Sequence, residues 1–333
     1  MEQPIQVRDP TRASNLKNMP KRYAYLGPEG TFTEAALRNL RPEALEESRV
    51  PCEGVASVFD AVRSGEVDGG VVPLENSVEG GVTATIAELI NGEPLVITGE
   101  TAVPVEFSLF ARAEVSPEDV KRVATHPHAL AQCRDWLARN MPGVETHTVS
   151  STAAAARAVS EPGSPYDAAI CAVIAGEKYG LHALADGIGD RSDAATRFIQ
   201  LSRLGALPPP TGADRTSIIA FIADDHPGAL VELLNQFAVR GVNLSRLESR
   251  PTGDALGNYC FSIDAEGHIA DARVGEALMG IRRVCRDVRF LGSYPRSGRS
   301  TEPEPTLRAR PTTEADFAEA ERWLARIRAG QVD

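Results

Sequence analysis

The order of strand-like and helix-like segments changes once along the chain, and that change limits the folds open to it. From Tyr23 to about Leu184, apolar strand patterns alternate with helical patterns, as in YAYLG, TEAALRNL, FDAVRSG and GGVVPLE. This order is typical of α/β layers built on mostly parallel sheets. From Thr216 to Tyr294 the order becomes β-α-β-β-α-β, which predicts a separate ferredoxin-like domain.

The alternating part of the chain is long enough for two α/β lobes. We expect one lobe over about 21–103 plus 196–205 and the other over 104–190, with a cleft between them like that of periplasmic binding proteins. The Pro-rich segment 206–214 predicts a linker, and 215–295 the ferredoxin-like domain. We interpret residues 1–20 as a flexible arm and 296–333 as a polar tail that ends in a short amphipathic helix.

Charge and cysteine content exclude several classes of protein. With 35 Lys and Arg against 46 Asp and Glu, the net charge is -11, which argues against nucleic acid or a membrane surface as a partner. The five cysteines are odd in number, widely spaced and set in apolar segments, so we expect buried free thiols in a reducing compartment. The sequence has no run of 18 apolar residues and no secretory signal pattern, which predicts a cytoplasmic protein.

Two motifs of the first expected lobe could bind an anion, although each is also an ordinary turn. In LGPEGTFTEAAL, Gly30 lies where a strand passes into a helix, and Thr31 and Glu34 have capping-box spacing. Backbone N–H groups at such a helix start can bind an anion. In VVPLENSVEGGV, Asn76 and Ser77 follow a buried strand, but Asn, Ser and Gly are common in turns of no special function.

The second expected lobe contributes two further strand-to-helix junctions. In ATHPHALAQC, Thr125 ends a strand, and helical spacing alone places Gln132 on a solvated stripe. His126 and His128 lie nearby, but no other ligand residue has the spacing of a metal site, so we expect no metal. In TVSSTAAAARAV, Ser151 or Thr152 is the expected cap of a helix rich in alanine.

The segment DAATRFIQLSR begins an apolar strand with Thr196, Arg197 and Phe198. A hydroxyl beside a fixed cation at a strand start can be a solvated strand end. It can also form part of an active site if other polar groups converge there.

These motifs together resemble one family. GPEGTFTEAA, VPLENSVEG, HPHALAQC, SSTAAAA and ATRF, followed by PGALVELLNQFAVRGVNLSRLESRP, look like prephenate dehydratase with a C-terminal ACT regulatory domain. The match spans roughly residues 22 to 295, and several motifs in the same order are more specific than any one of them. The resemblance implies conversion of prephenate to phenylpyruvate, with loss of carbon dioxide and water, on the way to phenylalanine. It implies no cofactor and no metal.

The resemblance also assigns residues. Thr196 would donate a proton or hydrogen bond to the leaving hydroxyl, Arg197 would clamp a substrate carboxylate, and Phe198 would wall the site. Substrate-orienting roles fall to residues of the other catalytic motifs: Gly30, Thr31, Asn76, Ser77, Thr125, Gln132, Ser151 and Thr152. This chain has His128 where family members often have Gln.

The ACT segment resembles a sensor of phenylalanine, bound where two such domains meet in a homodimer or homotetramer. The residues that match its effector motifs, or lie between them, are Gly228, Ala229, Leu230, Asn243, Leu244, Glu248, Ser249, Arg250 and Pro251. We expect a chain without residues 212–333 to keep turning over while no longer responding to phenylalanine. Two other functions stay open at this stage: arogenate dehydratase, and a non-catalytic two-lobed protein that binds a small anion.

Overall fold

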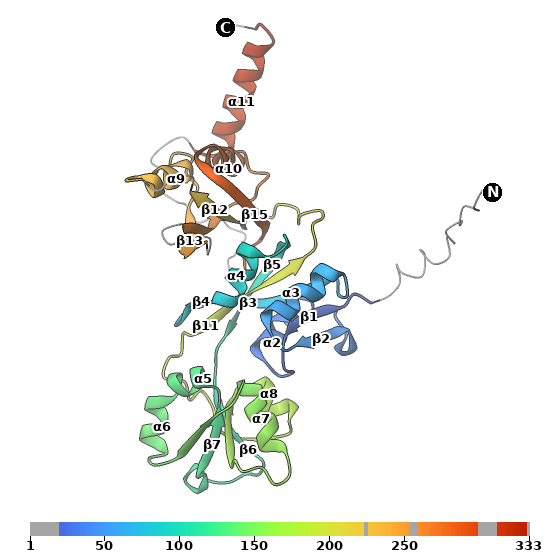
Figure 1. The fold of residues 1–333 in the computed structure, drawn as a ribbon, viewed down its shortest axis with the longest axis vertical. Helices are drawn as coiled ribbons and strands as arrows, with labels where there is room; N and C mark the ends of the chain where they lie inside the picture. Colours follow the sequence, from blue (N-terminus) through green and yellow to red (C-terminus); the bar gives the residue numbers. More distant parts are fainter. Residues whose placement is uncertain (1–19, 223–225, 253–258, 299–311, 332–333) are drawn as a thin grey trace, which may run out of the picture.

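The computed structural model describes residues 20–222, 226–252, 259–298 and 312–331, and within them the chain forms three units stacked along its long axis (Figure 1). The first lobe lies in the middle, the second lobe at one end and the C-terminal domain at the other. The expected α/β class, with two lobes followed by a ferredoxin-like domain, is confirmed.

The first lobe is a mixed sheet in the order β2-β1-β3-β11-β5, with β4 paired to β3. Strand β11 runs antiparallel to both neighbours, while β1, β2 and β3 are parallel. Its strands are β1 (Tyr23–Leu26), β2 (Arg49–Cys52), β3 (Gly69–Asn76), β4 (Gly80–Gly81), β5 (Val96–Pro104) and β11 (Ala195–Ser202). Its helices are α2 (Phe32–Leu40), η2 (Glu46–Ser48), α3 (Val55–Ser64) and α4 (Thr83–Asn91). The chain therefore leaves this lobe after β5 and returns to the middle of its sheet as β11.

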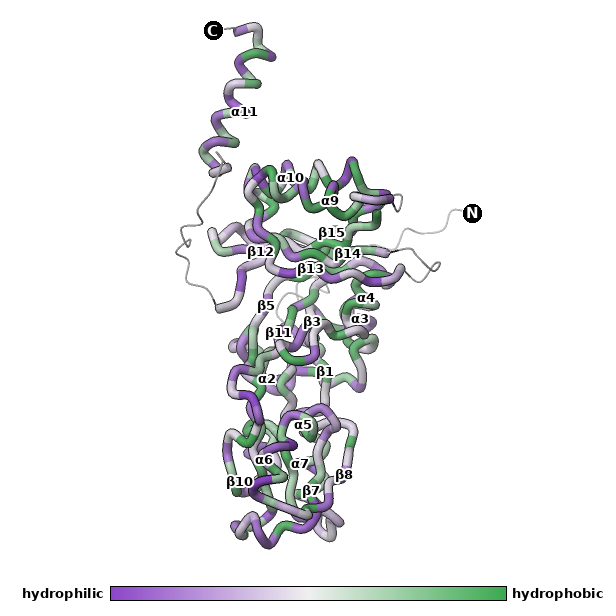
Figure 2. The backbone as a smooth tube through the Cα atoms, turned by 90° about the vertical axis from the view of Figure 1, so that its left-hand side faces the viewer, coloured by the Kyte–Doolittle hydropathy of each residue, from purple (hydrophilic) through white to green (hydrophobic). Residues whose placement is uncertain are grey.

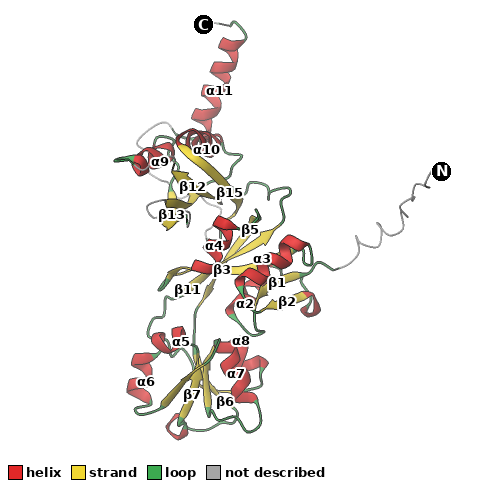
Figure 3. Cartoon of the chain, viewed as in Figure 1, coloured by secondary structure: helices red, strands yellow, loops and turns green. Residues whose placement is uncertain are grey.

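The second lobe is a sheet in the order β10-β6-β9-β7-β8. Figure 3 shows α5 and α6 on one side of it and α7 and α8 on the other. Its strands are β6 (Ser108–Ala111), β7 (Arg122–Thr125), β8 (Glu145–Thr148), β9 (Ala168–Cys171) and β10 (His182–Ala185). Its helices are η3 (Pro117–Asp119), α5 (Pro127–Gln132), α6 (Arg134–Asn140), α7 (Thr152–Ser160) and α8 (Val173–Lys178). The buried alanines of α7 let that helix pack closely on the sheet.

The C-terminal domain is an antiparallel sheet in the order β13-β14-β12-β15. Helices α9 and α10 cover the face that points away from the first lobe (Figure 2). The elements are β12 (Asp214–Ile222), α9 (Ala229–Ala238), β13 (Leu244–Pro251), β14 (Tyr259–Glu266), α10 (Ala272–Val284) and β15 (Cys285–Pro295). The expected amphipathic helix follows as α11 (Glu314–Arg328), which begins at a capping box of Thr313 and Asp316 and projects from the domain.

The bare face of this sheet packs on the first lobe, and the two units share one hydrophobic core. Strand β12 is apolar on both faces: Ile218 packs with the domain's own helices, whereas Ile219 joins a cluster that contains Val58 and Ile97 of the first lobe. Gly292 of β15 approaches so closely that an added Cβ would collide with the Ile97 backbone. Removing residues 212–333 would expose this core, so the turnover expected of the shortened chain stays a prediction that depends on how well the first lobe tolerates that exposure.

Two other expectations can be compared with the described part of the chain. It contains no helix long and apolar enough to cross a membrane. All five cysteines are free; Cys133, Cys171, Cys260 and Cys285 are buried, and Cys52 is partly buried. Burial raises the pKa of the Cys133 and Cys171 thiols to about 12, so these thiols stay protonated at neutral pH.

Candidate active site

A cleft of about 340 Å³ lies between the first and second lobes, a volume that suits a small organic acid. Residues from both lobes line it, including seven of those expected from the motifs. They are Thr31, Asn76, Thr196 and Phe198 from the first lobe and Gln132, Ser151 and Thr152 from the second.

Thr196 and Asn76 form the polar centre of the first lobe's wall. They are register partners at the paired ends of β11 and β3, and Asn76 Nδ2 donates to Thr196 Oγ1 at 2.8 Å. The Asn76 amide is fixed in this orientation because its Oδ1 accepts the backbone N–H of Val78 at 2.8 Å and that of Glu79 at 3.2 Å. Since the Thr196 oxygen already accepts a bond from Asn76, its own proton is available to an acceptor in the cleft.

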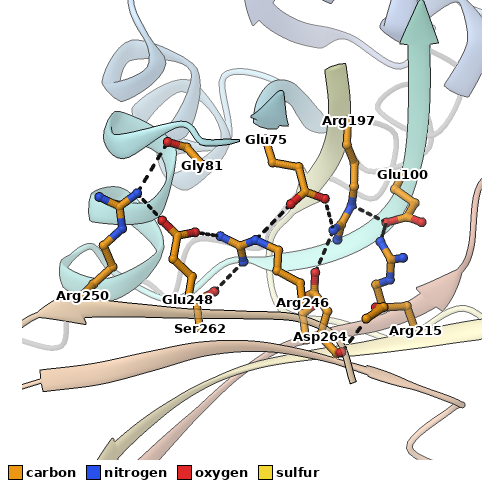
Figure 4. Close-up of polar contacts among 12 residues, drawn as sticks. Glu75, Gly81, Glu100, Arg197, Arg215, Arg246, Glu248, Arg250, Ser262 and Asp264 are labelled. Carbon is orange, nitrogen blue, oxygen red and sulfur yellow. Dashed lines mark hydrogen bonds and ion pairs between the residues drawn. The ribbon is translucent and has the colours of Figure 1, made fainter. Parts of the chain in front are cut away.

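Arg197 does not line the cleft, which corrects its expected role as a clamp for a substrate carboxylate. Successive side chains of a strand point to opposite faces, so Thr196 and Phe198 face the cleft while Arg197 faces the C-terminal domain. Its guanidinium is bonded there to Glu75, Glu100 and Asp264 (Figure 4). Phe198 is 2% exposed and forms an apolar part of the cleft wall, as expected.

Three other expected residues, of which Gly30 and Thr125 are buried and Ser77 is exposed, are not among the residues that line the cleft. Gly30 donates its N–H to the Glu34 carboxylate at 2.7 Å and lies against Ala175 of the second lobe. Ser77 exchanges two hydrogen bonds with the Ala195 backbone. Thr125 is fully buried and donates to the Ile170 carbonyl at 2.8 Å. The polar groups of all three residues are thus bonded to the protein itself.

The second lobe presents the start of helix α7 to the cleft. Ser151 is its N-cap, and its Oγ accepts the N–H of Ala154 at 2.9 Å. The backbone N–H groups of the first turn carry the positive end of the helix dipole, and such groups bind anions well. In the first lobe, helix α2 starts at the N-cap Thr31, and the Glu34 carboxylate stabilises this start by accepting the Gly30 N–H. Burial raises the pKa of this carboxyl, but the Gly30 N–H and Arg38 outweigh that effect, so its pKa lies below the ordinary value.

Sequence reasoning missed a polar contact that crosses the cleft. Glu79, just after Asn76, reaches the second lobe, where its carboxylate lies 2.9 Å from His128 Nδ1 and accepts a bond from Gln132 Nε2 at 3.5 Å. Burial and the neighbouring His128 hold the pKa of His126 below its ordinary value, despite the opposing charge of Glu79. Neither Glu79 nor the histidines stand out by periodicity, because they occupy a turn and a helix start. The reassignment of Gln132 from a solvated stripe to the cleft is consistent with this geometry.

The charged side chains that line the cleft are carboxylates and histidines. Among its described lining residues, Glu53 and Glu79 are acidic, two are histidines, His126 and His128, and none is Lys or Arg. The described residues also contain no group of three or more His, Cys, Asp and Glu side chains that could hold a metal ion. A hollow that adjoins this cleft at Gly27, Glu53 and Ser150 contains Arg157. An anion could therefore be bound by helix N-termini, polar side chains, histidine or this arginine.

The residues of the expected effector motifs divide between α9 and β13. Gly228 is the N-cap of α9 with φ 99°, a conformation that favours glycine. On β13, Glu248 forms ion pairs with Arg246 and Arg250, and the Arg250 guanidinium lies 3.5 Å from the Gly81 carbonyl oxygen of the first lobe (Figure 4). Glu248 and Arg250 thus face the first lobe, whereas Ser249 and Pro251 are exposed.

Comparison with known proteins agrees with this architecture. A family model described as prephenate dehydratase matches residues 23–205, and one for the ACT domain matches residues 217–283. The chain belongs to the prephenate dehydratase family. It is 47% identical over 312 residues to a prephenate dehydratase from Amycolatopsis methanolica, an alignment that covers 93% of this chain and 99% of that one. The family consists of hydro-lyases, which makes this chain an enzyme and confirms the expected activity class.

Two solved structures show how far the likeness extends. A prephenate dehydratase from Arthrobacter aurescens, in complex with L-Phe, is 50% identical with a TM-score of 0.83, and the match covers 92% of this chain and 99% of that one. GqqA, described as a quorum-quenching acylase, is 32% identical with a TM-score of 0.74, covering 83% of this chain and 98% of that one. Since related folds can host different reactions, the chemistry has to be argued from the residues of the cleft.

Proposed function

We propose that the cleft binds prephenate and that Thr196 assists departure of its ring hydroxyl. Loss of the ring carboxylate as carbon dioxide releases an electron pair into the ring, and that pair expels the hydroxyl group from the opposite carbon. One proton converts the leaving hydroxide to water, and the ring becomes aromatic. The products are phenylpyruvate, carbon dioxide and water.

The observation that carries this proposal is the bond from Asn76 to Thr196. Negative charge develops on the leaving oxygen during the reaction, so a donor aimed at it stabilises the transition state more than the ground state. Asn76 Nδ2 donates to Thr196 Oγ1 at 2.8 Å, so the hydroxyl proton of Thr196 points away from Asn76. A threonine hydroxyl is a weak acid, so it donates a hydrogen bond early and passes on a proton late, or relays one from water.

The carboxylates of prephenate need other partners because Arg197 is not in the cleft. The first turn of α7, capped by Ser151, offers backbone N–H groups to one of them. Glu79 holds His128 and Gln132. We propose that a substrate carboxylate replaces Glu79 as their partner. Phe198 is an apolar part of the same wall as Thr196. We propose that it excludes water from the bound substrate ring and so strengthens the Thr196 hydrogen bond.

Regulation by phenylalanine is the second part of the proposal. The chain carries an ACT domain, and the similar Arthrobacter aurescens enzyme was solved with L-Phe. We propose that phenylalanine binds at the α9 start and β13, where two ACT domains meet in a homodimer or homotetramer, and so regulates phenylalanine synthesis. Titration of the full chain with phenylalanine during turnover tests this, with sedimentation to measure the assembly. Unchanged turnover at saturating phenylalanine would contradict it.

Arogenate dehydratase activity is a second candidate because of Glu79. Arogenate carries an ammonium group where prephenate has a keto oxygen, and a carboxylate in the cleft is a suitable partner for an ammonium. Comparing kcat/KM for the two substrates decides between them, with phenylpyruvate followed by its absorbance in alkali and phenylalanine by chromatography. We expect prephenate to be preferred. Higher kcat/KM for arogenate would reverse the assignment, and turnover of neither would contradict both.

A further inference from the structure

Arg197 lies at the centre of a buried ion network between the first lobe and the ACT domain (Figure 4). Its side chain is 10% exposed. Its nitrogens lie 2.7 Å from Glu100, 2.9 Å from Glu75 and 2.7 Å from Asp264. Nη2 also donates to the Tyr294 hydroxyl at 3.2 Å. Two of these four partners belong to the first lobe and two to the ACT domain.

The charges of the network balance. Arg215 of the ACT domain pairs with Glu100 at 2.7 Å, and Arg246 pairs with Glu75 at 3.2 Å. Arg246 also pairs with Glu248, and Glu248 with Arg250. Four arginines therefore face four carboxylates, and buried ions are tolerated only when paired in this way. Burial opposes ionisation of Asp264, but the surrounding arginines outweigh that effect and hold its pKa below the ordinary value. Asp264 is consequently charged at neutral pH.

Asp264 is itself held rigidly. Ser217 Oγ donates to its Oδ1 at 2.6 Å, and the same hydroxyl lies 2.7 Å from the Tyr294 hydroxyl. Its Oδ2 binds Arg197. Asp264, Ser217 and Tyr294 come from β14, β12 and β15, so three strands of the ACT sheet fix the position of one carboxylate.

The ion network lies directly next to the polar centre of the active site along the same two strands, one residue further on each. Across β11 and β3, Thr196 is the register partner of Asn76 and Arg197 that of Glu75. The first pair bonds on the cleft face and the second on the ACT face. On the β3 side the register shifts between Arg197 and Phe198, where Leu74 of β3 has no partner in β11, whereas pairing with β5 is continuous from Ala195 to Gln200. The contact of Arg197 with Glu75 therefore lies beside a β-bulge of β3.

We infer that Asp264 of the ACT domain is a positioning residue for the dehydratase reaction, acting through Arg197 on the placement of Thr196. The inference rests on the proposed role of Thr196. A hydrogen-bond donor acts on the developing charge only if it is held to within a fraction of an ångström. The ACT domain therefore contributes to turnover even in the absence of an effector.

The test is Asp264→Asn in the full chain, which keeps the shape of the side chain and removes its charge. Because Asp264 does not reach the cleft, we expect kcat for prephenate to fall about tenfold or more with KM changed less than about twofold. Glu266→Gln is the matched control: it lies on the same strand and removes a carboxylate paired with Arg296 at 2.8 Å. We expect its kcat to stay within about twofold of wild type. Wild-type kcat in Asp264→Asn would overturn the inference.

A double variant, Asp264→Asn with Thr196→Ala, distinguishes a positioning effect on Thr196 from a general disturbance of the active site. If Asp264 acts through Thr196, adding Asp264→Asn to Thr196→Ala should lower kcat no further, whereas independent damage would multiply the two losses. Multiplicative losses overturn the inference. Should Asp264→Asn not fold, Tyr294→Phe removes one hydroxyl from the same network and is put through the same cycle. The proposed function is read separately, from turnover of prephenate by the wild type.

Discussion

The first lobe has two interfaces of opposite character. Toward the ACT domain it shares a hydrophobic core and the buried ion network of Arg197. Toward the second lobe it borders a cleft, and the polar contacts that cross it are more exposed, such as Glu79 with His128 and Glu29 with Lys178 at 2.7 Å. Separating the first lobe from the ACT domain would cost much free energy, because it leaves buried charges unpaired. The first and second lobes can be separated by a ligand that replaces their exposed polar contacts.

This difference suggests how the molecule moves. The first lobe and the ACT domain should behave as one body, and the second lobe should move against it, since two chain crossings join the lobes. Variants on the two sides of β11 can test this difference directly.

The largest effect is expected from Arg197→Met, on the ACT side. It leaves the carboxylates of Glu75, Glu100 and Asp264 buried without their cation, so we expect the free energy of unfolding to fall by about 3–5 kcal/mol. Urea unfolding followed by circular dichroism measures it. The control is Arg122→Met, which removes a more exposed pair with Asp167 in the second lobe and should cost less than about 1 kcal/mol. Unchanged stability with a strongly raised KM would instead restore Arg197 as a substrate clamp.

Thr196→Ala, on the cleft side of the same strand, should act on chemistry rather than stability. Loss of one well-placed donor lowers kcat about 100- to 1,000-fold, while KM for prephenate changes little because the bond matters mainly in the transition state. Steady-state kinetics with prephenate gives both constants. Thr196→Ser keeps the hydroxyl and should retain most of the activity. An alanine variant with wild-type kcat would rule out the proposed donor.

A smaller effect is expected at the contact that crosses the cleft. Glu79→Gln weakens the competition for His128 and Gln132, and since exposed ion pairs contribute up to about 1 kcal/mol, KM for prephenate should fall by at most about fivefold. Glu145→Gln alters a similar pair with His147, 3.2 Å apart and away from the cleft, and should leave KM unchanged. If KM rises in Glu79→Gln, Glu79 supports substrate binding instead of competing with it.

The smallest effect concerns pH. The pKa of His126 in the folded protein is lowered, by burial first and by His128 second, while an unfolded histidine titrates near about 6.5. As pH falls through about 6.5, the unfolded chain binds a proton before the folded one, so stability is lost on acidification and is fully present above that pH. His126→Asn keeps a capping side chain at the start of α5 without the titration. The melting temperature of wild type should fall more steeply from pH 7 to 5.5 than that of the variant; parallel slopes would contradict this.

The sequence predicted the architecture because periodicity reports directly on burial. Alternation of strands and helices predicted both lobes, and β-α-β-β-α-β predicted the last domain. The shared core was also visible in part, since β12 is apolar on both faces and a strand of that kind is buried on both. The prediction of a separate domain rested instead on the Pro-rich composition of the linker, residues 206–214.

The errors at the site have different causes. The direction of Arg197 could have been derived from the two-residue period of a strand, which puts Thr196 and Phe198 on one face and Arg197 on the other. The resemblance treated the three residues as one unit and hid that difference. The roles of Thr125 and Ser77 depend on which backbone groups lie nearby in space, and Glu79 reaches a partner from another lobe. None of these contacts has a signal in local sequence.

The central position of β11 also determines the order in which the two catalytic lobes can fold during synthesis. The second lobe and its sheet are complete by Ala185, whereas the first lobe's sheet lacks its strand between β3 and β5 until Ser202 has been added. During synthesis the second lobe can therefore fold on the ribosome while the first waits with an open sheet. Thr196 lies on the strand that closes that gap, so the step that completes the first lobe's sheet is also the step that supplies the donor.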